Sequence, residues 1–156
     1  MSEGTALLVI DMQVGLVAGA YRAGEVLGTI GTLLAKARSS GTTVVYLQHE
    51  SDEFEPLKRG TPTWQIHPDI APAEGESVIS KRASDSFYQT PLRRELEAKG
   101  VRHIVVTGMM TEACVDTTSR AAISLGYACD QRDNLRSHRP SLRPASGTGP
   151  TSSVTV

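Results

Sequence analysis

Cys114 stands where a thiol could act as a nucleophile, just after a strand and near the start of a helix. Residues 103–107 read HIVVT and are closed by Gly108, a pattern typical of a buried strand that ends in a tight turn. Thr111 is a candidate N-cap for a helix that runs to about Gly126. Unpaired amides and the dipole at a helix start favour the thiolate, the nucleophilic form of cysteine. The alternative is a small buried apolar residue.

Two charged residues stand at the ends of other predicted strands. Asp11 follows the apolar run ALLVI at residues 6–10, and Lys81 follows SVIS at residues 77–80. Functional groups gather at the carboxyl ends of strands in open parallel sheets, so we expect both side chains to lie near Cys114. A carboxylate, an ammonium group and a thiol can serve as base, thiolate stabiliser and nucleophile. Taken singly, each charge could instead be a solvated residue at a strand end.

The elements that must position these side chains alternate along the chain. The apolar patterns predict strands at residues 6–10, 43–48, 77–80 and 103–107, and helices at residues 23–39, 91–99 and 111–126. Such alternation predicts a three-layer α/β/α fold around a parallel sheet. Residues 49–76 are predicted to form a long loop. Loops of this length are usually functional or disordered.

Composition restricts the classes of protein that fit. The 156 residues suit one domain, and a formal net charge of −1 gives no sign of nucleic-acid binding. The start, MSEGT, has no basic segment, and the apolar run after it is too short to cross a membrane. Two cysteines argue against a disulfide framework, so we expect a cytoplasmic protein.

Five motifs follow one another in the order found in a known family. They are LLVIDMQ at residues 7–13, WQIHP at 64–68, GESVISK at 75–81, DSFYQTPL at 85–92 and VTGMMTEACVDTTSRAA at 106–122. Over residues 5–127 the chain resembles the isochorismatase-like cysteine hydrolases, which include nicotinamidases, N-carbamoylsarcosine amidohydrolase and ureidoacrylate amidohydrolases. The resemblance implies an isochorismatase-like, Rossmann-like fold.

The resemblance also assigns roles to residues. The family's catalytic triad falls on Asp11, Lys81 and Cys114, the three residues found at strand ends. A cis peptide bond of the family would join Met109 to Met110, and the amides of Met110 and Cys114 would form the oxyanion hole. One such donor can lower a barrier by about 2.7 to 4 kcal/mol.

The activity implied is acyl transfer from a small amide or ureido substrate through a thioester at Cys114. Gln13, Trp64 and Phe87 would line the substrate pocket, with core packing as the alternative for the two aromatic residues. Another branch of the superfamily hydrolyses the vinyl ether of isochorismate and carries aspartate in place of the cysteine, which makes that activity the less favoured reading here.

We expect no metal and no cofactor. Nicotinamidases hold a divalent ion through an Asp-x-His pair and a further histidine, whereas residues 48–52 read QHESD. The remaining histidines, His67, His103 and His138, are scattered and lack ligand spacing. His49 could still line the site from the end of the second strand.

The pattern changes after Tyr127. Residues 128–156 contain four arginines, three prolines and no apolar period. This predicts an isochorismatase-like domain of residues 1–127 and an irregular tail of residues 128–156 that replaces the family's last strands, which would leave the strand before Cys114 at the edge of the sheet. Either a frameshift near codon 128 or a divergent tail would explain the change, and an intact mass ending at Val156 would argue against the frameshift.

Other functions stay open at this point. A chain without those strands could be a catalytically inactive or binding-only member of the family. A redox sensor that uses Cys114 and Cys129 has weak support, since their spacing is not C-x-x-C. The partner we expect is a small-molecule amide, without nucleic acid or membrane, and the resemblance leaves a homo-oligomer open.

Overall fold

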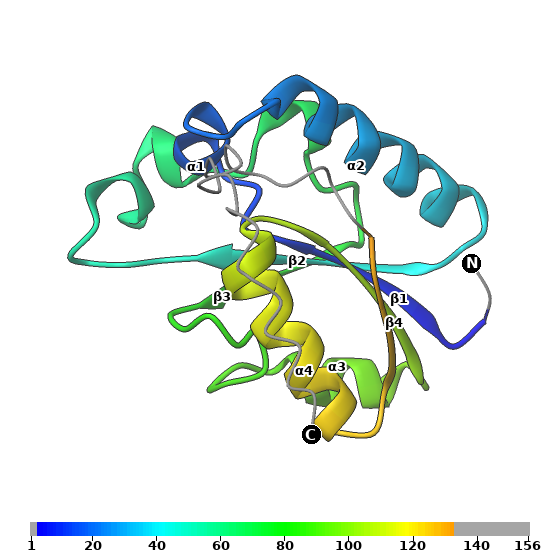
Figure 1. Ribbon diagram of the computed structural model, residues 1–156. Coiled ribbons are helices and arrows are strands. Elements are labelled where there is room, and N and C mark those ends of the chain that lie inside the picture. The colour runs from blue at the N-terminus through cyan, green and yellow to red at the C-terminus, as the bar shows by residue number, and fades with distance from the viewer. Residues whose placement is uncertain (1–2, 133–156) are drawn as a thin grey trace, which may run out of the picture.

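A parallel sheet of five strands, in the order β3-β2-β1-β4-β5, organises the computed structural model, which describes residues 3–132 (Figure 1). The strands are β1 (Thr5–Ile10), β2 (Thr43–His49), β3 (Ser77–Lys81), β4 (His103–Gly108) and β5 (Ala128–Gln131). The α-helices are α1 (Val14–Ala18), α2 (Ala23–Ser39), α3 (Leu92–Ala98) and α4 (Asp116–Ser124). A π-helical turn, Thr111–Val115, leads into α4.

The central strand β1 is buried on both faces because helices cover the sheet from both sides. Leu8 and Ile10 pack in one apolar cluster with residues of α3 and α4, whereas Leu7 and Val9 pack in a second cluster with residues of α2. Figure 1 shows α2 along one face and α3 and α4 along the other. Period-two alternation of side chains divides the strand in this way. The predicted three-layer fold is confirmed.

The pairing of the strands brings their carboxyl ends to one edge of the sheet. His49, the last residue of β2, lies opposite Lys81, the last residue of β3. Ile10, the last residue of β1, lies opposite Gly108, the last residue of β4. Whatever follows these four residues therefore starts from the same edge, as the strand-end argument requires.

Gly108 lies so close to β1 that no side chain fits there. A Cβ atom at this position would stand 2.1 Å from the carbonyl oxygen of Ile10, and φ is +126°. The next residue, Met109, donates its amide to that same carbonyl at 2.8 Å. This contact fixes the turn that leads from β4 toward Cys114.

The long connection after β2 is ordered by short elements of its own. Within it lie three 3₁₀ helices, Glu55–Leu57, Pro62–Trp64 and Pro68–Ile70. Two contacts hold the segment against the sheet and α2. The hydroxyl of Tyr46 in β2 donates to the Ile70 carbonyl at 2.9 Å, and Arg38 in α2 forms an ion pair with Glu76 at 2.8 Å. The loop is therefore part of the folded domain.

Two expectations about local structure are wrong. The sequence after Tyr127 does not become irregular at once, because residues 128–131 form β5, which pairs in parallel with β4. The strand before Cys114 is therefore not an edge of the sheet. Thr111 is not an N-cap either, since Met110 holds the cap position and the turn begins at Thr111. Residues 133–156, which make up most of the predicted tail and include His138, lie outside the described residues.

None of the helices found between residues 3 and 132 is both long and apolar enough to cross a membrane.

We predict that Gly108→Ala destabilises the fold by more than about 3 kcal/mol, because its Cβ would collide with backbone and the residue would keep a positive φ. The matched control is Gly28→Ala in α2, where a Cβ meets nothing within 4 Å. The control should stabilise the helix by about 0.5 to 1 kcal/mol. Urea denaturation of both variants measures the difference, and equal stabilities would contradict the close contact.

Candidate active site

Lys81 places a buried ammonium group at the carboxyl edge of the sheet. Its side chain is 0% exposed, and Nζ lies 3.2 Å from Oδ2 of Asp11. Nζ also donates to the carbonyl oxygen of Ala83 at 2.9 Å and lies 3.3 Å from Nδ1 of His49. A buried charge needs such partners, because unpaired it would cost several kcal/mol.

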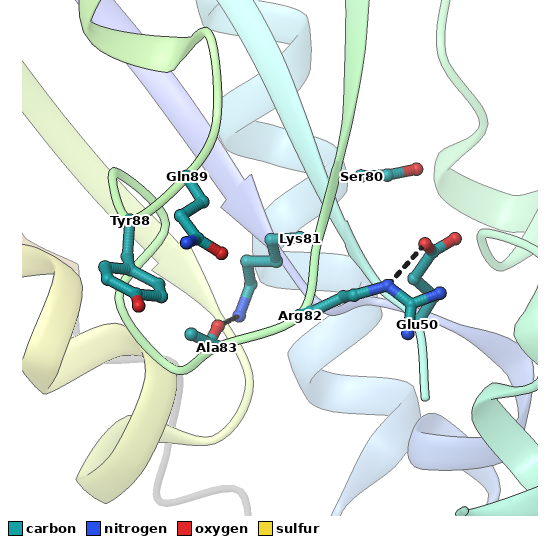
Figure 2. A pocket seen from close by; sticks show the side chains of 7 residues that line it. All are labelled: Glu50, Ser80, Lys81, Arg82, Ala83, Tyr88 and Gln89. Carbon is teal, nitrogen blue, oxygen red and sulfur yellow. Dashed lines mark hydrogen bonds and ion pairs between the residues drawn. The ribbon is translucent and has the colours of Figure 1, made fainter. Parts of the chain in front are cut away.

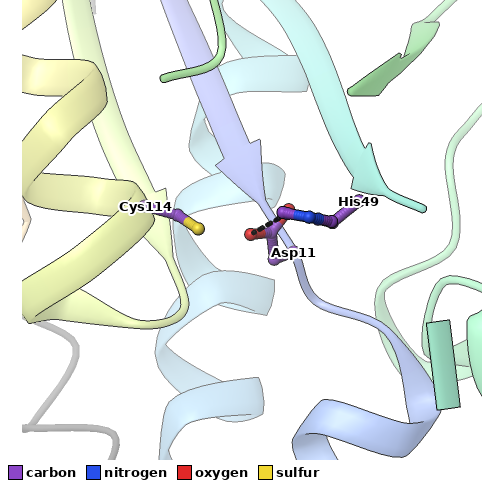
Figure 3. Close-up of side chains that lie close together, drawn as sticks. All are labelled: Asp11, His49 and Cys114. Atoms are coloured by element: carbon purple, nitrogen blue, oxygen red, sulfur yellow. Dashed lines mark ion pairs between the residues drawn. The ribbon is translucent and has the colours of Figure 1, made fainter. Parts of the chain in front are cut away.

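Asp11 lies in the middle of the site. It directly follows β1 with a left-handed φ of +54°, and its amide donates to the Leu47 carbonyl at 2.9 Å. Figure 3 shows its carboxylate between the sulfur of Cys114 and the ring of His49. Oδ1 is buried and has no hydrogen-bond partner among residues 3–132.

Cys114 is half-buried in the π-helical turn that follows β4. The Met109–Met110 peptide bond in front of this turn is cis, the isomer that the family resemblance implies. Ala113 and Val115 donate their amides to the Met110 carbonyl at 3.1 and 3.2 Å, which anchors the turn. Asp11 thus lies near both other residues predicted from strand ends: its Oδ2 is 3.2 Å from Nζ of Lys81, and side-chain atoms of Asp11, His49 and Cys114 lie within 4.8 Å of one another.

The thiol of Cys114 is held in its protonated form, contrary to the expectation of a favoured thiolate. Burial and the negative charge of Asp11 raise the pKa of Cys114 to about 11, whereas Lys81 and a hydrogen bond with Ser84 act to lower it. The helix-start argument fails mainly because the sulfur is buried, and the negative charge of Asp11 adds to the effect. At neutral pH the resting pair is therefore a thiol beside a carboxylate.

Asp11, His49 and Cys114 offer oxygen, nitrogen and sulfur atoms close enough to hold a metal ion. The Lys81 ammonium, however, lies 3.2 Å from the Asp11 oxygen and 3.3 Å from the His49 nitrogen. A divalent ion at the same ligands would meet this positive charge at short range. These distances disfavour a metal, and the expectation of none stays a prediction.

Gln13 is fully buried, and its carboxamide is used by backbone groups, while its expected place in the substrate pocket stays a prediction. Its Nε2 donates to the carbonyls of His49 and Trp64, both at 2.8 Å, and its Oε1 accepts the amide of His49 at 3.0 Å. Gln13 therefore joins β2 to the long loop behind the site.

The two aromatic residues expected in the pocket also serve packing. Phe87 packs against the α3 and α4 side of the core and stacks on Tyr127 with ring centroids 5.9 Å apart. Trp64 is half-buried, and its carbonyl accepts hydrogen bonds from Gln13 and Gln48. For Phe87 the core-packing alternative describes the contacts seen.

A pocket of about 240 Å³ lies beside Lys81 instead. Besides Lys81 and its neighbours, it is lined by Glu50, Tyr88 and Gln89. Figure 2 shows the Lys81 side chain between the loop that carries Tyr88 and Gln89 and the pair formed by Glu50 and Arg82. Sequence reasoning missed these lining residues, since only the fold brings residues 88–89 to Lys81.

A thiol, a carboxylate and an ammonium group lie together at the carboxyl edge of the parallel sheet in this three-layer α/β protein. Comparison with known families gives the same class, since residues 5–129 match the isochorismatase domain. The chain belongs to the isochorismatase family.

The chain is also similar to proteins whose names state an activity. The chain is 38% identical over 125 residues to a streptothricin hydrolase of Streptomyces noursei, covering 78% of this chain and 45% of the relative. It is 29% identical over 164 residues to a ureidoacrylate amidohydrolase of Cronobacter sakazakii, covering 80% and 71%. The crystal structure of N-carbamoylsarcosine amidase from Thermoplasma acidophilum superposes with a TM-score of 0.77 at 27% identity, covering 88% and 86%. The chain spans about half the length of the streptothricin hydrolases it matches.

We predict that Asp11→Asn lowers the pKa of the Cys114 thiol, because it removes the negative charge that opposes thiolate formation while Lys81 remains. Asparagine suits the positive φ at this position. Lys81→Met should have the opposite effect. In the native protein, alkylation of Cys114 by iodoacetamide should rise about tenfold per pH unit up to high pH, since only the thiolate reacts.

Alkylation of each cysteine is measured by peptide mass spectrometry between pH 6 and pH 11. Cys129 serves as an internal reference in each sample. An Asp11→Asn profile that coincides with the native one, or that is shifted to higher pH, would contradict the role of the carboxylate.

Proposed function

We propose that the chain is a cysteine hydrolase that cleaves a C–N bond of a small amide or ureido substrate through a thioester intermediate. The observation that carries the proposal is the buried Asp11 carboxylate, which lies between the thiol of Cys114 and the ammonium group of Lys81. Relatives named as amidohydrolase and amidase support the class of substrate.

The first step moves one proton and forms one bond. Because the pKa of Cys114 is raised, the sulfur starts as S–H, and attack on the substrate carbonyl requires its proton to leave. Asp11 Oδ1 takes that proton as the S–C bond forms. The amides of Met110 and Cys114 are the proposed donors to the oxyanion, as the family resemblance implies.

The second step returns the same proton. The C–N bond breaks while protonated Asp11 passes its proton to the departing nitrogen, which leaves as an amine or ammonia, and a thioester remains on Cys114. Water then attacks the thioester, giving its proton to Asp11, and the carboxylic acid leaves as the proton returns to sulfur. Lys81 holds the carboxylate in its ionised form between cycles.

The alternatives are less well supported by the residues at the site. Vinyl ether hydrolysis in the same superfamily uses an aspartate where this chain has Cys114. A catalytically inactive or binding-only protein is the contrasting hypothesis. A cytoplasmic location, a homo-oligomer and the lack of a cofactor stay predictions.

The proposal is tested by ammonia release from a panel of small amides, including nicotinamide, carbamoyl amino acids and ureido acids. We expect at least one substrate to be hydrolysed, and Cys114→Ser to lose activity by a factor of about 10⁴ or more. Cys129→Ser is the matched control and should retain activity, since Cys129 lies in β5 away from the triad.

A covalent adduct on the Cys114 peptide after a rapid acid quench would identify the thioester. Full activity of Cys114→Ser, or an adduct on Cys129 instead, would overturn the mechanism.

A further inference from the structure

The Lys81 ammonium has three N–H donors and no acceptor. Three acceptors lie within reach of Nζ: Ala83 O at 2.9 Å, Asp11 Oδ2 at 3.2 Å and His49 Nδ1 at 3.3 Å. The side chain of Lys81 is fully buried, so none of these donors is exposed to solvent in the structure. Each of the three partners therefore matters to the orientation of the ammonium group.

This arrangement favours one tautomer of His49. An ammonium group can only donate, so the 3.3 Å contact with Nζ is a hydrogen bond only when Nδ1 of His49 carries no proton. An imidazolium would lose this bond and put a second positive charge 3.3 Å from Nζ. The charged and titratable groups around the ring are Asp11 after β1, Lys81 in β3 and Cys114 before α4, with Glu50 next in the chain.

We propose that His49 is a positioning residue, present as the neutral tautomer with its proton on Nε2, which holds the Lys81 ammonium against Asp11. The importance of His49 for catalysis rests on the proposed function.

The backbone of His49 is fixed from the opposite side. Gln13 binds both the amide and the carbonyl of His49, at 3.0 and 2.8 Å. The strand register places His49 directly opposite Lys81. A continuous chain of contacts thus runs from Gln13 through His49 and Lys81 to Asp11, and none of these contacts requires a substrate. The acceptor is in place before any ligand binds.

The experiment compares His49→Leu with His49→Asn. Leucine fills similar space but removes the acceptor, whereas the Oδ1 of asparagine stands near the position of Nδ1 and restores it. With one donor unsatisfied, the charged form of Lys81 is disfavoured and gives less support to the thiolate. We expect alkylation of Cys114 at pH 8 to fall on the order of threefold to tenfold in His49→Leu, and to return close to the native rate in His49→Asn.

Cys129 in the same samples and the thermal unfolding of each variant control for a general loss of structure. The alkylation profile needs no substrate, so it tests His49 even if every amide of the panel proves inert. Where a substrate is found, kcat should fall in His49→Leu with KM little changed.

The tautomer is read directly from the ¹⁵N shifts of the His49 ring in labelled protein, where Nδ1 should be unprotonated and Nε2 protonated. A protonated Nδ1 at neutral pH would overturn the proposal. So would a His49→Leu profile that coincides with the native one or moves to lower pH, or a His49→Asn variant no better than His49→Leu.

Discussion

The structure around the site depends on one buried ion pair, between the Lys81 ammonium and the Asp11 carboxylate at 3.2 Å. Both side chains are almost fully buried, at 0% and 3% exposure, so each charge relies on the other and on a few hydrogen bonds. Removing one partner of such a pair would leave the other charge buried and uncompensated, which typically costs about 3 to 5 kcal/mol. The contacts from Ala83 and His49 complete the pair on the lysine side.

Parallel pairing of the strands makes this ion pair possible, because both side chains start from the same edge of the sheet. Asp11 follows β1, Lys81 ends β3, and β2 lies between them in the sheet and contributes His49. Because β1 is covered on both faces, it cannot slip by one residue without turning its apolar side chains to the wrong layers. The same burial that stabilises the core therefore fixes where the carboxylate emerges.

The sequence contains enough to place the triad but not to set its protonation. Asp11, Lys81 and Cys114 could be found because each stands at or soon after the end of a strand-like segment, which is a local pattern. The high pKa of the thiol depends instead on its burial and on the charge of Asp11, which only the fold sets. The hydrogen bonds of Gln13 could not be predicted because its partners, His49 and Trp64, are distant in sequence. β5 was missed because its residues are mostly exposed and it is held by backbone pairing with β4, which leaves no apolar period to detect.

A protonated thiol at rest is compatible with hydrolysis of an amide, and even suits it. Nitrogen leaves an amide poorly unless it receives a proton, and a thiolate formed by loss of its proton to solvent would have none to give. In the proposed mechanism the sulfur's proton would pass to Asp11 and stay within the site until the C–N bond breaks. The raised pKa of Cys114 would also favour return of the proton to sulfur when the thioester is hydrolysed, which would reset the pair for another cycle. The positive charge of Lys81 would stabilise whichever of the two groups is ionised.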